Sequence, residues 1–457
     1  MTEPSAATRQ IKILSKSEWQ TKLKSIAWNP SGKVLDIVGT RIEAVMPNSR
    51  LSMLARLESP MHPDEGVLAE VVGFRGGRAL LLPYGDLAGI APGAQITPKH
   101  MYDKIPVGNF LLGHVISPFM EDISGKKLPI PPGCAHEFLH RLAPNPLERE
   151  KISQPLVLGI RSLDGLLTMG QGQRIGIMAG SGVGKSVLLG RIAKESAADI
   201  NVIGLIGERG REVRQFLDNE LGPEGLRKSV VVVITSDQSP LMKIRGAKVV
   251  TTIAEYFASQ GKKVLLMLDS LTRVAQAQRE IGLAVGEPPT SKGYPPSVYA
   301  LLPRLLERCG PQPHGHGSIS GIYTVLVDGD DFNDPMPDAI RSILDGHINL
   351  SRDLAAKGHF PAIEVLTSVS RVMQQIVSPE HLKLAQRIKS LMSEYRKNYD
   401  FIQFGSYQPG TNPLLDQAIL LMGKIEAYLH QDLGDSSNFS QTLEKMIQIF
   451  TPESATE

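Results

Sequence analysis

A glycine-rich segment constrains this chain more than any other feature. Residues Ala179–Ser186 read Ala-Gly-Ser-Gly-Val-Gly-Lys-Ser, between the apolar run Ile175–Met178 and the helix-like stretch Val187–Ala193. Strand, glycine-rich turn and helix form the context of a phosphate-binding loop, where backbone N–H groups and a helix N-terminus face the phosphates. The strict pattern opens with glycine, and Ala179 replaces it at the least demanding position. A structural turn that happens to carry a lysine is the alternative, but the flanking pattern favours a nucleoside triphosphate site.

The loop also predicts the role of its own side chains. Lys185 is expected to reach the outer phosphates, and the Ser186 hydroxyl is expected to hold Mg²⁺. The residues expected to contact the nucleotide here are Gly180, Ser181, Gly182, Val183, Gly184, Lys185, Ser186 and Val187.

Bulk properties narrow the class of protein. A chain of 457 residues is expected to form two or three domains. The formal net charge of only +2 gives no electrostatic case for nucleic acid as the main partner. Cys134 and Cys309 are the two cysteines, which favours a reducing compartment over a disulfide framework. The polar N-terminus and strand-sized apolar runs predict a cytoplasmic protein whose membrane contact is peripheral.

The texture of the sequence changes along the chain. Residues 11–28 carry a loose apolar helical stripe, which fits a partner-binding segment or a helix docked on its own core. Short apolar runs broken by glycine then predict a small antiparallel β-barrel. Within it, Gly73–Arg78 has a weak likeness to an RNA-binding strand, but a hairpin turn is favoured because clustered aromatics are missing. The expected divisions are a partner-binding segment at 1–30, the barrel at 31–98, a nucleotide-binding domain at 99–378 with a proline-rich extended connection near 129–155, and a helical domain at 379–457.

The nucleotide-binding segment alternates between strands and helices. Apolar runs such as Val202–Ile206, Val230–Ile234, Val264–Leu268 and Ile322–Val327 are separated by helical stretches. This alternation predicts an α/β fold with a buried parallel sheet that has helices on both faces. Beyond residue 379, apolar residues recur on one helical face, which predicts the helical domain.

Two carboxylates follow predicted strands. Asp269 comes directly after Val264–Leu268, where a carboxylate could fix Mg²⁺ through water or merely cap the next helix. The phosphate loop favours the metal role. Glu208 follows Val202–Ile206 at the same edge of the sheet and could polarise a water, although a solvated charged turn fits the spacing equally well.

Several motifs in order resemble the rotary-type ATPases. Within that group, Ala179–Ser186 and Gly358–Ile363 look most like the flagellum-specific ATPases of the type III protein export apparatus, and the resemblance runs from the barrel to about Ile419. It implies a RecA-like P-loop ATPase core between an N-terminal β-barrel and a C-terminal helical domain. The remaining motifs are Gly207–Val213, Asp269–Arg273, Gly286–Pro289, Gly293–Ser297 and Ser368–Arg371.

The resemblance also implies residue roles. Glu208 would be the catalytic carboxylate that activates water, and Arg209 would lie near the terminal phosphate. Arg371 would reach into a neighbouring subunit as an arginine finger that stabilises charge on the transferred phosphoryl group. Phe360 would lie against the adenine, for which a core aromatic is the alternative. Tyr407 would lie on the other side of the base.

The implied assembly is a homohexamer that hydrolyses ATP with Mg²⁺ and couples hydrolysis to protein transport. Its loop Glu287–Ser297 would face the central pore and a central stalk protein. The other implied partners are a dimeric negative regulator at the N-terminal segment, membrane proteins of the export gate, and export cargo with its chaperones. The location implied is the cytoplasm, peripherally at the inner membrane. Two histidines in a variable loop, His314 and His316, fit a solvated loop better than a metal site.

Competing functions remain distinct in what they require. A virulence type III secretion ATPase would share the same chemistry with different cargo. A Rho-like hexameric RNA translocase would need a base-stacking N-terminal domain and a basic channel, and neither is visible in the sequence. A non-catalytic ring subunit would lack the carboxylate that Glu208 supplies.

Overall fold

The computed structural model describes residues 31–59, 61, 66–99, 104–125, 127–327 and 335–451. The segment 1–30, expected to bind a regulator, lies outside the described residues. The chain forms two compact units, Met1–His100 and Met101–Glu457. Among the described residues, no helix combines the length and apolarity needed to cross a bilayer.

The first unit is a closed antiparallel barrel of six strands in the order β1-β2-β5-β4-β3-β6. Its side chains alternate between buried and partly buried positions, as in Val67–Arg75 (β4). The expected hairpin is confirmed, because Gly76 and Gly77 join β4 to β5 with positive φ. The other strands are β1 (Gly32–Val38), β2 (Arg41–Val45), β3 (Leu54–Leu57), β5 (Arg78–Pro83) and β6 (Gln95–Lys99).

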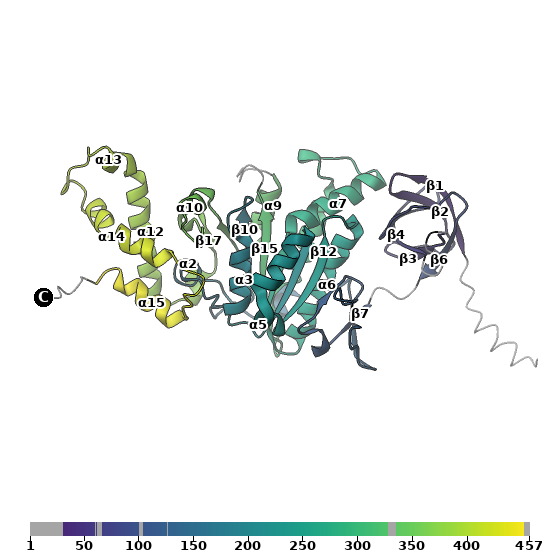
Figure 1. The fold of residues 1–457 in the computed structure, drawn as a ribbon, viewed down its shortest axis with the longest axis horizontal. Coiled ribbons are helices and arrows are strands. Elements are labelled where there is room, and N and C mark those ends of the chain that lie inside the picture. Colours follow the sequence, from purple (N-terminus) through teal and green to yellow (C-terminus); the bar gives the residue numbers. More distant parts are fainter. Residues whose placement is uncertain are drawn as a thin grey trace, which may run out of the picture. The chain divides into compact units, whose positions relative to one another are not determined.

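A mostly parallel sheet organises the second unit, which confirms the predicted fold class (Figure 1). Its order is β17-β16-β10-β15-β13-β11-β12-β8, with β14 paired to β15. Among the described strands of this sheet, only the β14 and β17 pairings are antiparallel. The strands are β8 (Val115–Ile116), β10 (Arg174–Ala179), β11 (Ile200–Glu208), β12 (Ser229–Thr235), β13 (Lys263–Asp269), β14 (Gly310–Pro311), β15 (Ser318–Leu326), β16 (Gly346–Asn349) and β17 (Val369–Ser370).

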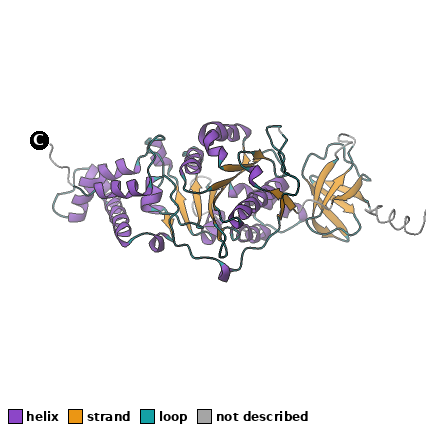
Figure 2. Cartoon of the chain, turned by 90° about the horizontal axis from the view of Figure 1, so that it is seen from below, coloured by secondary structure: helices purple, strands orange, loops and turns teal. Residues whose placement is uncertain are grey.

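Helices flank this sheet (Figure 2). Several begin where the sequence supplies a capping side chain followed by proline: Ser239 and Pro240 start α6. A one-turn π-helix, Phe216–Leu221, follows α4. The helices are α2 (Arg161–Leu166), α3 (Lys185–Glu195), α4 (Gly210–Gln215), α5 (Gly222–Arg227), α6 (Pro240–Ser259), α7 (Leu271–Val285), α8 (Pro296–Leu306), α9 (Pro335–Ile343), α10 (Arg352–Ala356) and α11 (Met373–Ile376).

The chain ends in helices, as expected. They are α12 (Pro379–Lys397), α13 (Tyr399–Gln403), α14 (Pro413–Leu429) and α15 (Phe439–Gln448). The apolar face of α12 and the apolar residues of α14 pack into the same core as the sheet strands. Helix α2 contacts α12, α14 and α15, so the helical region has a continuous apolar connection to the nucleotide-binding region.

The proline-rich connection near 129–155 contains a short strand. Residues Ala135–Phe138 form β9, which pairs antiparallel with β7 (Lys104–Val107). Arg308, which is 3% exposed, anchors the following turn: it donates to the Leu139 carbonyl at 3.0 Å and to both carboxylate oxygens of Glu255. Tertiary hydrogen bonds therefore hold a segment whose proline content alone predicts only an extended connection.

Candidate active site

The phosphate loop has the backbone shape that its glycines predict. Gly182 and Gly184 have φ of +78° and +83°, a region that residues with a Cβ rarely adopt. Gly184 occupies the N-cap of α3, which leaves the first N–H groups of that helix directed out of its end. Strand β10, this loop and α3 together present a partial positive charge suited to an anion.

Two carboxylates meet the loop lysine at the carboxyl edge of the sheet. The Lys185 ammonium lies 2.5 Å from Oδ1 of Asp269 at the end of β13, and 3.3 Å from Oε1 of Glu208 at the end of β11. Strand β11 pairs with β13, which brings both strand ends to this edge. Thr324 on β15 donates to Oδ1 of Asp269 at 2.5 Å. The structure therefore brings Lys185, Glu208 and Asp269 into one cluster.

The electrostatics of this cluster are strongly perturbed. Burial, reinforced by the Asp269 carboxylate, raises the pKa of Glu208 to about 7. Burial alone would lower the pKa of Lys185, but the charges of Asp269 and Glu208 outweigh it and raise that pKa. A hydrogen bond with Glu208 lowers the pKa of Glu212, one turn away. Glu208 thus has the proton affinity of a group that can accept a proton near neutral pH.

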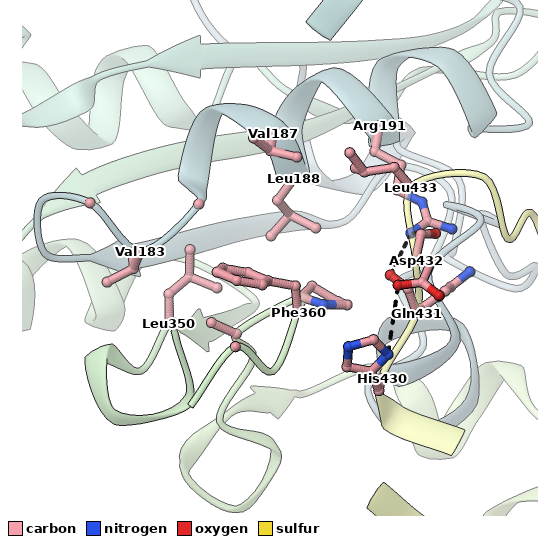
Figure 3. Close-up of a pocket in the computed structure, with 15 residues that line it drawn as sticks. Val183, Val187, Leu188, Arg191, Leu350, Phe360, His430, Gln431, Asp432 and Leu433 are labelled. Atoms are coloured by element: carbon pink, nitrogen blue, oxygen red, sulfur yellow. Dashed lines mark hydrogen bonds and ion pairs between the residues drawn. The ribbon is translucent and has the colours of Figure 1, made fainter. Parts of the chain in front are cut away.

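A pocket of about 430 Å³ opens beside the loop (Figure 3). Gly182, Val183 and Gly184 line one end, and the apolar side chains of Val187 and Leu188 on α3 line its side. Phe360 also lines it; its ring lies against Gly184, where an added Cβ would be 3.3 Å from Cε1 of the ring. This volume and its apolar lining suit a planar base attached to phosphates in the loop.

The remaining wall comes from a segment that the sequence reasoning missed. Residues 430–433, between α14 and α15, line the pocket beside Phe360. The backbone N–H of Gln431 donates to the Phe360 carbonyl at 2.9 Å, which joins the two neighbouring segments. No motif or periodicity marks this segment in the sequence.

Three predicted residues lie away from the pocket. Tyr407 does not line it; its hydroxyl donates to Oδ1 of Asp416 at 2.8 Å and contacts the Asn412 carbonyl at 3.1 Å. The Arg209 side chain is 78% exposed and pairs with Glu212 at 3.4 Å. Arg371 is exposed, follows β17, and donates to the Arg341 carbonyl at 3.3 Å. Within one chain, Tyr407 and Arg371 are not brought together with Lys185 and Glu208, and Arg209, which follows Glu208 in sequence, directs its side chain to Glu212.

The residues present fit Mg²⁺. Ser186 is exposed in the first turn of α3, and Asp269 is 4% exposed at the adjoining strand end, so the two offer hydroxyl and carboxylate oxygens. Hard oxygen ligands of this kind, with water completing the shell, are what Mg²⁺ prefers. His314 lies elsewhere: it is 98% exposed, and its Nδ1 is 2.8 Å from Glu150.

The loop expected to face a pore is anchored at both ends. Gly286 ends α7 with φ of +91°, and the Glu287 carboxylate accepts from the Ser297 backbone N–H at 3.1 Å. The Arg279 guanidinium lies 5.4 Å from the Tyr294 ring centroid. These contacts tie the loop to α7, the helix that follows Asp269 and Ser270 at the nucleotide edge.

Comparison with known proteins agrees with this arrangement. The ATP synthase alpha/beta family nucleotide-binding domain matches residues 159–370, the family's β-barrel domain matches 34–99, and the T3SS EscN ATPase C-terminal domain matches 377–448. The "Flagellum-specific ATP synthase" of Bacillus subtilis (strain 168) is 48% identical over 412 residues, covering 90% of this chain and 93% of that protein. The "Type 3 secretion system ATPase" of Sinorhizobium fredii (strain NBRC 101917 / NGR234) is 45% identical, covering 93% and 94%.

Solved structures give the same result. The assembled ATPase EscN of the enteropathogenic E. coli type III secretion system matches with a TM-score of 0.85 at 44% identity, covering 92% of this chain and 99% of that one. EscN in complex with its central stalk EscO matches with a TM-score of 0.83. The chain is an ATPase that belongs to the ATP synthase alpha/beta family, within its flagellar and type III secretion branch.

Proposed function

We propose that this protein hydrolyses ATP, as a homohexameric ring with Mg²⁺, to energise the unfolding and delivery of flagellar proteins into a type III export apparatus. The carrying observation is the contact of Lys185 with both Glu208 and Asp269, beside the phosphate loop and the base-sized pocket. The flagellar assignment is supported by the relatives, most of which are named flagellum-specific ATP synthases. The virulence secretion ATPases remain the second candidate, because they match nearly as well.

Each residue of the site has a proposed role. The loop N–H groups and Lys185 bind the phosphates, and in doing so the lysine exchanges its carboxylate partners for phosphate oxygens. Glu208 orients the attacking water and accepts its proton. Ser186 would hold Mg²⁺, together with Asp269 through water, and the metal would supply charge neutralisation at the phosphate oxygens.

The position of Arg371 supports a shared site. Its side chain is exposed on the edge of the sheet, where the Arg371 backbone N–H donates to the Asp345 carbonyl at 3.0 Å. Within one chain it does not line the pocket, so an arginine finger would have to serve a neighbouring protomer. Binding of a central stalk, a regulator at residues 1–30, the export gate, cargo and chaperones is part of the same proposal, as is a cytoplasmic location at the inner membrane.

Two experiments test the proposal. Lys185→Ala should abolish both nucleotide binding and turnover, because the ammonium is the cation expected to reach the outer phosphates; retained turnover would contradict the site. Replacing the chromosomal gene with the Lys185→Ala allele should stop secretion of flagellar subunits and swimming. Unchanged motility together with lost secretion of other proteins would favour the virulence assignment instead.

A further inference from the structure

The wall of the nucleotide pocket is fastened to the phosphate-loop helix by one buried arginine. We define the wall segment as residues 428–435, which run from the end of α14 toward α15. Arg191 lies on α3, two turns beyond Lys185, and is 6% exposed. Figure 3 shows its side chain pointing from α3 toward Gln431 and Asp432 of the wall segment.

The contacts of Arg191 are all to backbone oxygens of that segment, apart from one carboxylate on its own helix. Its Nη1 donates to the carbonyls of Gln431 at 3.2 Å and Asp432 at 3.0 Å, and its Nη2 donates to the Asp435 carbonyl at 2.5 Å. Its Nε donates to Glu195 at 3.1 Å. A planar guanidinium can satisfy several acceptors in this way at once, whereas an ammonium presents a single point charge.

A second arginine holds the base of the same segment. Arg161 on α2 donates to the carbonyls of Tyr428 at 2.8 Å and His430 at 2.5 Å, near the carbonyl end of α14, where helical hydrogen bonding stops. It therefore fixes where the wall segment leaves α14. Arg161 also pairs with the Asp435 carboxylate, so both arginines act on the wall segment; Arg191, which itself lines the pocket, is the one that joins the Gln431 and Asp432 carbonyls to α3.

We propose that Arg191 is a positioning residue for the base of the bound nucleotide. By holding Gln431 and Asp432, beside Phe360, to α3, it sets the width of the pocket between α3 and the wall segment, so affinity for ATP depends on it while affinity for the phosphate groups does not. This inference rests on the proposed function, because it requires the base to occupy this pocket. It also makes α3, which begins at the phosphate loop, a direct link between bound nucleotide and the C-terminal helices.

The test compares ATP with tripolyphosphate, which carries the phosphates without the base. Competition binding with the full-length protein and Mg²⁺ should show that Arg191→Met lowers the affinity for ATP by about tenfold or more. A loss of this size is expected when hydrogen bonds from a charged donor are removed. Tripolyphosphate affinity should be unchanged, and KM for ATP should rise more than kcat falls. Arg191→Lys should lie between, since it keeps the charge without the fork. Lys194→Met is the matched control: it removes an exposed cation from the same helix and should bind both ligands like the unaltered protein.

The outcomes separate this inference from the proposed function. Equal loss of ATP and tripolyphosphate affinity, or no loss of either, in the Arg191 variants overturns the positioning role. If Arg191→Met does not fold, the ratio of the two affinities in Arg191→Lys decides by the same criterion. Phe360→Ala tests whether the base occupies this pocket. If Phe360→Ala lowers the affinity for ATP while the Arg191 variants do not, only the positioning role fails. If Phe360→Ala leaves ATP binding unchanged, the base lies elsewhere and both statements fail.

Discussion

Replacing Glu208 with glutamine separates binding from hydrolysis in this site. The substitution keeps the size of the side chain, removes its charge, and leaves the shorter contact of Lys185 with Asp269 in place. With both carboxylates ionised, Lys185, Glu208 and Asp269 sum to a formal charge of −1; the glutamine variant brings that sum to zero. A polyanionic nucleotide therefore meets less repulsion in the variant.

The substitution is expected to lower the rate of hydrolysis strongly and to leave ATP affinity unchanged or raise it slightly. Removing a general base lowers the rate by about 10²–10⁴, or about 3–5 kcal/mol of barrier. The repulsion that the substitution removes is between the Glu208 carboxylate and a phosphate charge. For unit charges about 6 Å apart at an effective dielectric constant near 20 it is about 3 kcal/mol, an upper bound that Mg²⁺ and water reduce. We therefore expect kcat to fall by at least about a hundredfold while ATP affinity is unchanged or rises by about tenfold.

The assay pairs single-turnover hydrolysis with equilibrium binding of ATP on the same preparations. Asp218→Asn is the matched control, since it neutralises an exposed carboxylate of the neighbouring helical turn that pairs with Arg214. Glu208→Gln with a single-turnover rate within about threefold of the unaltered protein would refute the role assigned to this carboxylate. Loss of ATP binding in the same variant would refute the charge argument.

Other expectations follow from separate parts of the fold. Arg371→Ala should lower kcat by about 10³ or more, and mixing it with Lys185→Ala subunits should restore turnover; mixtures no more active than their components would contradict a shared site. Burial lowers the pKa of His381, whose Nε2 donates to the Gly165 carbonyl. The folded state favours neutral His381, so the contribution of this residue to stability is complete above about pH 6.5 and is lost as the pH falls below that value. His381→Gln should therefore make the free energy of unfolding depend less steeply on pH between pH 6.5 and 5. An unchanged slope would show that other groups cause the pH dependence. Arg308→Ala should destabilise the second unit by about 3–5 kcal/mol in denaturant titration, because it leaves Glu255 buried, and the double change Arg308→Met with Glu255→Leu should cost less.

The barrel and the parallel sheet were predictable because their signals are local. Glycine-separated apolar runs and buried strands alternating with helices are visible within windows shorter than one domain. The two-residue strands β8 and β17 were not predictable, because they are too short to show a periodicity. They form by pairing with the outer strands at the two edges of the sheet. Strand β9 was missed for a related reason: its pairing with β7 outweighs the surrounding prolines.

The site divides in the same way. The family resemblance singled out Phe360, and the structure places its ring against Gly184 of the phosphate loop. Tyr407 was singled out on the same ground, and the structure instead commits its hydroxyl to Asp416 within the helical region. The alternatives for Glu208, a water-polarising group or a solvated turn, were equal on spacing alone. Its contact with Lys185 and its raised pKa distinguish them, and both depend on neighbouring strands.

The chemistry of the loop Ala179–Ser186 and the strands that carry Glu208 and Asp269 can be read from the sequence, because contiguous residues set backbone shape and strand ends. Which distant groups face that loop depends on the packing of the folded chain. The bond from Arg191 to Gln431 spans 240 residues of chain, and no local preference encodes such a contact. It forms because buried carbonyls beyond a helix end need donors, and a guanidinium on the adjoining helix lies within reach of them.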